Sequence, residues 1–278
     1  MGQSGKDIES ATLNSLTDIV SIKENILRVI HKANSSHLGS CLSVVDILTV
    51  IYSEIVDREL ILSRDENRDI VIMSKGHAAA AYYAVLNKYD FISDADLEDY
   101  LEDGTHLGGH VHHLGNEFVE LSTGSLGHGL PYGVGTALSQ KKLNRTGRTF
   151  VVMSDGECDE GTTWESALLA NHLELSNLVV IIDRNLIQSL DSTENVLALE
   201  PLASKWTSFN WNVFEVDGHS HEELTNALIA KEGPLCVIAN TTKGKGVSFM
   251  EGQVLWHYKS PSKDEYDAAL QEIQGQEL

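Results

Sequence analysis

Residues 149–187 constrain the fold more strongly than any other stretch of this chain. An apolar strand, a helix and a second apolar strand are predicted there in succession, over residues 149–153, 161–173 and 178–182. This order predicts a βαβ unit, whose two strands lie parallel in one sheet and are joined by the helix. A chain built around such a unit is expected to form an α/β layer structure.

Polar residues follow both strands of this unit. Asp155 comes directly after the first strand and Asn185 follows the second, 30 positions further along (185 − 155). Ligands of open α/β sheets bind outside the carboxyl ends of the strands, so both side chains can face one site. A carboxylate and an amide carbonyl are hard oxygen ligands that suit Mg²⁺ bridging the oxygens of a diphosphate. Gly156 would let the backbone approach that diphosphate closely.

Strands and helices alternate elsewhere in the chain as well. Further strands are predicted over 70–73, 211–216 and 235–240, and helices over 13–33, 44–55 (with Ser43 as N-cap), 78–88, 94–101 and 201–209, from Gly127, and after Ser220. The pattern predicts an α/β fold with a doubly wound, mostly parallel sheet and helices on both faces. We expect one domain over 1–278, with a short N-terminal extension and an acidic C-terminal tail from about residue 260.

Composition excludes several classes of function. The formal net charge of −21 disfavours binding to nucleic acid or to an anionic membrane surface. No apolar run approaches the roughly 18–20 residues that cross a bilayer, and the N-terminus lacks an export signal. The three cysteines form no CxxC pair, which is typical of reduced thiols in the cytoplasm. These features predict a cytoplasmic protein that uses neither nucleic acid nor membrane.

Six motifs, in the same order, resemble those of the transketolase family. They are Asn34–Gly39, Ser74–His77, Gly109-His110, Thr123–Gly127, the Asp155 and Asn185 pair, and Trp256-His257. The match runs from about residue 13 to 260, and the chain looks like the N-terminal, diphosphate-binding portion of a transketolase. The resemblance implies the thiamine diphosphate-binding fold. It also implies transfer of a two-carbon ketol unit from a ketose donor to an aldose acceptor, dependent on thiamine diphosphate and Mg²⁺.

The resemblance also implies roles for individual residues. Mg²⁺, for which Ca²⁺ or Mn²⁺ can substitute, would be held by Asp155, Asn185 and the backbone carbonyl of Ile187. His77 and His257 would lie at the diphosphate and reacting carbon, and His37 and His110 at the substrate hydroxyls; imidazole can exchange protons near neutral pH. The cofactor-binding residues would be His77, Gly124, Ser125, Leu126, Asp155, Gly156, Glu157, Asn185 and His257.

Several positions depart from the usual family pattern. They are Leu38, Val111, Ser125, Ser154 and Tyr258. These departures keep the chemical groups of the site but could reshape the substrate channel. The sequence therefore leaves open which ketose and aldose are used, and whether the sugar is phosphorylated, nucleotide-linked or branched.

The resemblance further implies a partner chain. In transketolases the carboxylate that activates the cofactor's aminopyrimidine comes from a separate, pyrimidine-binding domain, and this chain ends at Leu278 without one. We therefore expect the partner to be a C-terminal, pyrimidine-binding transketolase subunit, in an α2β2 assembly, with Glu160 at the interface between the two chains.

Alternatives remain open from the sequence. For the whole chain they are the α-subunit of a 2-oxo acid dehydrogenase, the related deoxyxylulose phosphate synthase, and a non-catalytic regulatory subunit that binds the cofactor. Locally, a zinc site on His106, His110, His112 and His113 and a nucleophilic Cys158 are disfavoured, because metal-ligand spacing and an orienting base are lacking. The glycine–lysine run at 243–246 lacks P-loop spacing and is interpreted as a tight turn.

Overall fold

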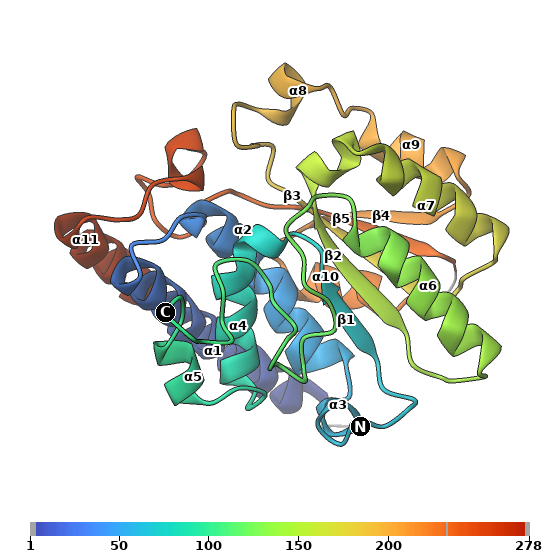
Figure 1. Cartoon of the computed structure of the whole chain (residues 1–278), viewed down its shortest axis with the longest axis horizontal. Coiled ribbons are helices and arrows are strands. Elements are labelled where there is room, and N and C mark those ends of the chain that lie inside the picture. Colours follow the sequence, from blue (N-terminus) through green and yellow to red (C-terminus); the bar gives the residue numbers. More distant parts are fainter. Residues whose placement is uncertain (1–3, 232, 276–278) are drawn as a thin grey trace.

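The computed structural model describes residues 4–231 and 233–275, with side chains from residue 18 onwards. Within these residues five strands form one wholly parallel sheet in the order β1-β2-β3-β5-β4 (Figure 1). The strands are β1 (Ile70–Met73), β2 (Thr149–Ser154), β3 (Leu178–Arg184), β4 (Asn212–Asp217) and β5 (Leu235–Asn240). The predicted α/β fold with a parallel sheet is confirmed.

Helices cover both faces of this sheet. In Figure 1, α6, α7 and α9 lie on one side of the strands, and α1, α2, α4 and α10 on the other. The α-helices are α1 (Ser4–Lys32), α2 (Leu38–Val50), α3 (Arg58–Leu62), α4 (Ala79–Lys88), α5 (Asp94–Glu98), α6 (Gly129–Lys142), α7 (Gly161–His172), α8 (Thr193–Val196), α9 (Leu202–Ser208), α10 (His221–Leu228) and α11 (Lys263–Gln274). Shorter helical turns are η1 (Ile51–Ile55), η2 (Gly76–Ala78), η3 (Asp155–Asp159) and η4 (Val254–His257).

Strands β1, β2, β3 and β5 are buried on both faces, which explains why they are largely continuous apolar runs in the sequence, whereas the edge strand β4 is mostly exposed or half-buried. Along β2, Phe150 and Val152 pack into the core beneath α1, α2 and α4, whereas Val151 and Met153 pack into the core beneath α6, α7 and α9. Alternate side chains of a strand point to opposite faces, so one strand supplies two cores. The sheet thereby fixes the carboxyl ends of its strands relative to one another.

Helix α2 differs from its prediction. It begins at Leu38, directly after His37, and Ser43 lies inside it rather than capping it. Every residue from Leu38 to Val50 is buried, so the helix has no polar stripe from which its boundaries could be recognised. The hydroxyl of Ser43 donates to Asp183 at the end of β3, which accounts for a polar residue at this depth.

The expectation that no segment is long and apolar enough to cross a membrane was wrong as far as length and hydropathy are concerned. Among the described residues, the 18-residue window Leu38–Ile55 passes that test of length and hydropathy. However, 83% of this window is buried inside the protein. Its apolar character is therefore explained by its place as the central helix between α1, α4 and the sheet.

Other predicted boundaries shift by a few residues. The first helix begins at Ser4 rather than near residue 13, the acidic helix ends at Glu98 rather than 101, and the glycine-rich helix begins at Gly129 rather than Gly127. The segment between α2 and β1, for which no helix was predicted, contains the short helix α3. The acidic tail forms α11, which is opened by a Ser262 capping box and packs against α1.

The packing of α6 on the sheet can be tested with two glycines of one helix. A Cβ on Gly133 would lie 2.5 Å from Cγ2 of Val151, whereas a Cβ on Gly135 would meet nothing within 4 Å. We expect Gly133→Ala to lower the free energy of unfolding by about 1–3 kcal/mol through overpacking. Gly135→Ala should leave it unchanged or raise it by up to about 1 kcal/mol, because alanine favours helix. Urea denaturation of both variants makes the comparison, and equal stability would contradict this packing.

Candidate active site

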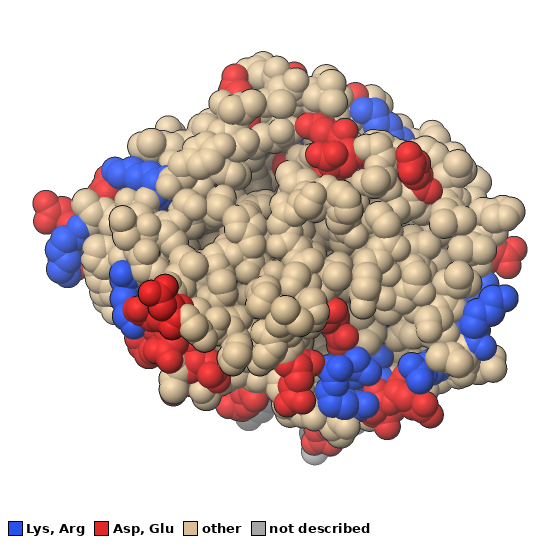
Figure 2. Space-filling model, viewed as in Figure 1, with Lys and Arg blue, Asp and Glu red and all other residues tan. Residues whose placement is uncertain are grey.

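A cleft of about 240 Å³ lies outside the carboxyl ends of the parallel strands. Segments that follow β1, β2, β3 and β5 all contribute to it, as expected for an open α/β sheet. Its lining residues are His37, Ser40, His77, His110, Gly124, Leu126, Ser154, Asp155, Gly156, Asn185, Ile187, Gln188, Ser189, Lys243, His257 and Tyr258. Figure 2 shows this face of the molecule hollowed near its centre.

The three predicted metal-binding residues lie together at this cleft. Asp155 is 2% exposed at the start of η3, and its carboxylate accepts hydrogen bonds from the backbone N–H groups of Gly156 and Leu186, each at 2.8 Å. Asn185 presents its amide nitrogen to Asp183, and its Oδ1 accepts the N–H of Ile187 at 3.2 Å. These contacts hold a carboxylate, an amide oxygen and a backbone carbonyl at one place.

Two buried ion pairs support these groups from below. Arg184 Nη1 lies 3.2 Å from Asp155 Oδ2, and Lys75 forms an ion pair with Asp183, with both side chains fully buried. Burial and the neighbouring Asp183 carboxylate raise the pKa of Asp155, against the opposing effect of Arg184. Burial alone would raise the pKa of Asp183 as well, but the Lys75 ammonium lowers it below its usual value. Asp183 therefore remains ionised as the partner of Lys75.

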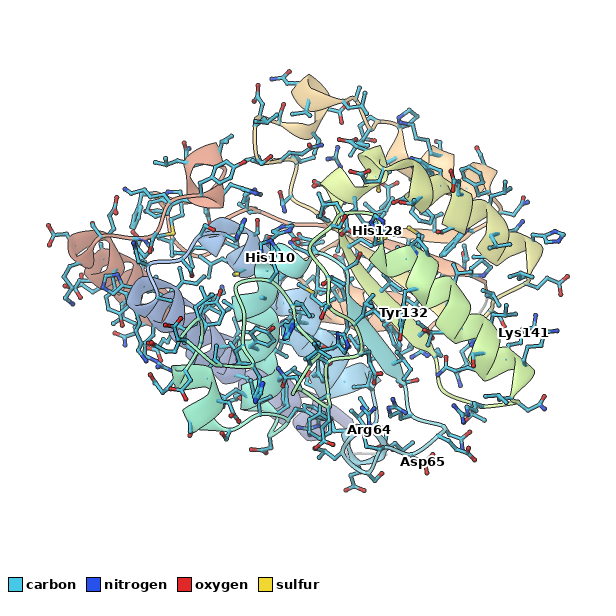
Figure 3. The ribbon with its side chains drawn as sticks, viewed as in Figure 1. Arg64, Asp65, His110, His128, Tyr132 and Lys141 are labelled. Carbon is cyan, nitrogen blue, oxygen red and sulfur yellow. The ribbon has the colours of Figure 1, made fainter. Side chains whose placement is uncertain are left out.

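Four histidines from four segments surround the cleft. The ring centroid of His37 lies 5.4 Å from that of His77, 5.5 Å from His110 and 5.1 Å from His257. His37 has a left-handed backbone with φ 73°, which is uncommon for a residue other than glycine and is frequent at functional sites. Figure 3 shows His110 on the loop that precedes α6, near the carboxyl ends of the strands.

Three histidines of this cluster, His37, His77 and His257, are electrically neutral at neutral pH. Burial, with smaller effects from His110 and Lys243, lowers the pKa of His37 to about 4. Burial and Lys243 lower the pKa of His257 to about 3, and burial and Lys75 lower that of His77 well below its usual value. Neutral imidazoles can donate one hydrogen bond and accept another, which suits the hydroxyl groups of a sugar.

Comparison with known proteins decides the family. A sequence model described as "Transketolase, thiamine diphosphate binding domain" matches residues 18–277. A subunit of the apulose-4-phosphate transketolase of Phocaeicola vulgatus is 37% identical over 90% of this chain and 90% of its own length. The corresponding protein from Actinobacillus succinogenes, which has the same name, is 40% identical over 88% of this chain and 91% of its own length. The chain belongs to the transketolase family.

Longer transketolases match the same region. Human transketolase is 33% identical over 88% of this chain but 39% of its own length. The structure of transketolase from Leishmania mexicana superposes with a TM-score of 0.84 at 27% identity, covering 94% of this chain and 41% of that one. This chain therefore spans about two-fifths of these transketolases. These matches confirm the prediction that this chain is the N-terminal subunit of a transketolase that binds thiamine diphosphate.

Two predicted cofactor-binding residues do not line the cleft of this transketolase. Ser125 is exposed outside it, and Glu157 is fully buried behind it. The Glu157 carboxylate accepts hydrogen bonds from the hydroxyl of Ser74 and from the backbone N–H groups of Gly127 and Ser154. Glu157 thus fastens the glycine-rich loop to the strand ends instead of reaching a ligand directly.

Lys243 is the main site residue that the sequence interpretation missed. Its run does form a turn, with Gly244 at φ 80°, but the Lys243 side chain is buried at 1% exposure and lines the cleft. Burial and the nearby Lys75 lower its pKa to about 8, so it still carries a charge at neutral pH. A lone lysine in a glycine-rich turn gives little sequence signal for such burial. Lys75 was likewise recognised only as part of a histidine motif.

The disfavoured local alternatives find no support. Among the residues that the structure describes, no group of three or more His, Cys, Asp or Glu side chains is arranged to hold a metal ion. The side chain of His113 instead contacts the Ser122 hydroxyl at 2.6 Å. Cys158 is buried, and burial raises the pKa of its thiol above the usual value, which disfavours the nucleophilic thiolate.

The neutral histidines predict how stability depends on pH. His37, His77 and His257 have folded-state pKa values below the usual 6.5, so the unfolded chain binds more protons as the pH falls below 6.5. The free energy of unfolding should therefore decrease from pH 6.5 towards pH 5, each such histidine contributing up to about 1.4 kcal/mol per pH unit. His77→Gln should make this slope shallower in urea denaturation.

The exposed His128, at the start of α6, offers a matched control (Figure 3). His128→Gln should leave the slope between pH 6.5 and 5 as it is in the unaltered chain. If His77→Gln changes the slope no more than His128→Gln does, His77 is not held neutral by the fold.

Proposed function

We propose that this chain holds the magnesium diphosphate of thiamine diphosphate and contributes to transfer of a two-carbon ketol unit from a ketose to an aldose. The observation that carries the proposal is the convergence of Asp155, Asn185 and the Ile187 carbonyl with four histidines at one cleft. All three donors are hard oxygens, which fit Mg²⁺ and leave Ca²⁺ or Mn²⁺ as substitutes. The carbonyl of Ile187 already accepts a cationic group, since Lys243 Nζ lies 3.1 Å from it.

Each residue then has a role that its position supports. Bound thiamine diphosphate would supply the electron sink for cleavage of the carbon–carbon bond. His77 and His257, with Gly156, would contact the diphosphate and the region of the reacting carbon, and His37 and His110 would bind substrate hydroxyls. Gly124 and Leu126 would support the thiamine ring from the loop that Glu157 holds in place.

We propose that the partner is a C-terminal, pyrimidine-binding transketolase subunit, in an α2β2 assembly. The matches support this, because the chain covers nine-tenths of the relatives that are named as transketolase subunits and about two-fifths of the longer transketolases. Figure 2 supports it as well: most charged side chains lie around the periphery of the hollowed face, and the surface beside the hollow is largely uncharged apart from one acidic group above it. Glu160 is exposed beside η3 and is proposed to lie at the interface with the partner.

The substrate is proposed to be a small sugar or sugar phosphate. Relatives are named for apulose 4-phosphate and for 6-deoxy-6-sulfo-D-fructose, so different sugars are handled within this family. We further propose that residues 1–278 form one domain, since every described strand belongs to one sheet. A cytoplasmic location is supported by three free, buried cysteines.

Calorimetric titration tests the cofactor site. Thiamine diphosphate with Mg²⁺ should bind tightly to a mixture of this chain and its candidate partner, and Asp155→Ala should weaken that binding by about 100-fold or more. Glu165→Ala, which removes an exposed carboxylate of α7 outside the cleft lining, is the matched control and should bind normally. Tight binding by the isolated chain would overturn the partner proposal, and no binding in either case would overturn the cofactor proposal.

The docking surface can be tested with two exposed leucines. Leu190 is 77% exposed and follows Ser189 of the cleft lining, whereas Leu143 is 56% exposed at the far end of α6. Leu190→Asp should weaken association with the partner by about tenfold or more, because it places a charge in a covered apolar contact. Leu143→Asp should not. Sedimentation of the mixtures measures both, and equal effects would place the interface elsewhere.

A further inference from the structure

The backbone around Lys243 is held by contacts on both sides. The preceding N–H, of Thr242, donates to Nε2 of His219 at 2.9 Å, and Nδ1 of His219 lies 2.8 Å from Asp46 on α2. The following N–H, of Gly244, donates to the carbonyl of Gly39 at 2.9 Å. The turn is thus tied to α2 twice, and the Lys243 side chain enters the cleft from a fixed backbone.

The Lys243 ammonium group has two hydrogen-bond partners in the cleft. Its Nζ lies 3.1 Å from the Ile187 carbonyl oxygen and 2.9 Å from Nδ1 of His257. The ion pairs found among the described residues include none with Lys243. Lys243 is therefore a buried cation held by a carbonyl and an imidazole. Its hydrogen bond to Nδ1 of His257 bears directly on which ring nitrogen of that histidine carries the proton.

An ammonium group donates hydrogen bonds and cannot accept them, so Nδ1 of His257 must be the acceptor. A neutral imidazole carries one N–H, which must then lie on Nε2. We propose that Lys243 is a positioning residue that fixes His257 as its Nε2–H tautomer, so that His257 meets the ligand of the cleft as a hydrogen-bond donor.

The geometry leaves Nε2 as the nitrogen with which His257 can contact a ligand. No hydrogen bond to this atom is found within the part of the chain that the structure describes, and the ring lies beside those of His37 and His77, with centroids 5.1 and 5.7 Å away. The backbone carbonyl of His257 accepts the N–H of His37 at 3.0 Å, which restricts the position of the backbone that carries the ring. The ligand atom that it meets must be an acceptor oxygen, of a carbonyl, an alkoxide or a phosphate; its identity as part of sugar or cofactor rests on the proposed function.

Nitrogen NMR of the free chain measures the tautomer directly. With ¹⁵N-labelled histidine at pH 7, two-bond proton–nitrogen correlations distinguish Nε2–H from Nδ1–H, and His257→Gln identifies the signals. We expect His257 in the unaltered chain to favour Nε2–H by about tenfold or more, as a hydrogen bond to a charged group implies. Lys243→Met, which keeps a chain of similar length without a donor, should lower this ratio and make Nδ1–H detectable.

Lys245→Met is the matched control, because Lys245 lies in the same turn and no hydrogen bond or ion pair between it and His257 is found among the described residues. It should leave the ratio unchanged. A predominant Nδ1–H tautomer in the unaltered chain would overturn the proposal without any variant being made, and so would an unchanged ratio in folded Lys243→Met. The measurement uses neither cofactor nor partner, so failure of the transketolase proposal would appear in the calorimetric titration and not here.

Discussion

The carboxylate of Asp183 is the point on which the geometry of the cleft depends. It lies at the end of β3 and binds Lys75 after β1, Ser43 within α2 and Thr241 after β5. One buried charge thus ties together three strand ends and the central helix. Removing one partner of a buried ion pair typically costs about 3–5 kcal/mol, because the other charge is left uncompensated. That penalty keeps these segments in one arrangement. The positions of the cleft residues that they carry are fixed in the same way.

The same buried charges reconcile an acidic protein with an anionic ligand. The chain carries a formal charge of −21, yet Asp155 and Asp183 are each balanced by a buried cation, and Lys243 adds a positive charge with no carboxylate partner among the described residues. Surface charges are screened over about 8 Å at physiological ionic strength, whereas buried groups are screened much less. A diphosphate bound in the cleft with the proposed Mg²⁺ would therefore experience Lys243 and that metal ion more strongly than the distant acidic surface.

The strand bounds and the position of the cleft could be predicted from the sequence, because they depend on residues close together in the chain. Strands β1 and β5 were predicted with their observed bounds, since continuous apolar runs end there on polar residues, and Asp155 and Asn185 were placed by the rule that parallel strands end at one edge. The errors fall where a distant contact decides. From the local sequence Ser43 resembles a helix cap, but its hydroxyl bonds Asp183, which is distant in the sequence. Lys243 likewise resembles a surface lysine, but it is buried because its turn is hydrogen-bonded to α2.

Burial divides the site into a fixed floor and an open rim. Asp155, Asn185 and Lys243 are each less than 10% exposed and are held by hydrogen bonds to groups at the end of β3 or directly after it, so changing any of them disturbs the core. His110 and Tyr258 stand at the exposed edge, with Tyr258 59% exposed. Substitutions at the rim cost little stability, whereas those in the floor cost much. The groups that would bind magnesium diphosphate are thus constrained by the stability of the fold. Substrate specificity can instead change through substitutions at the exposed rim and in the partner subunit.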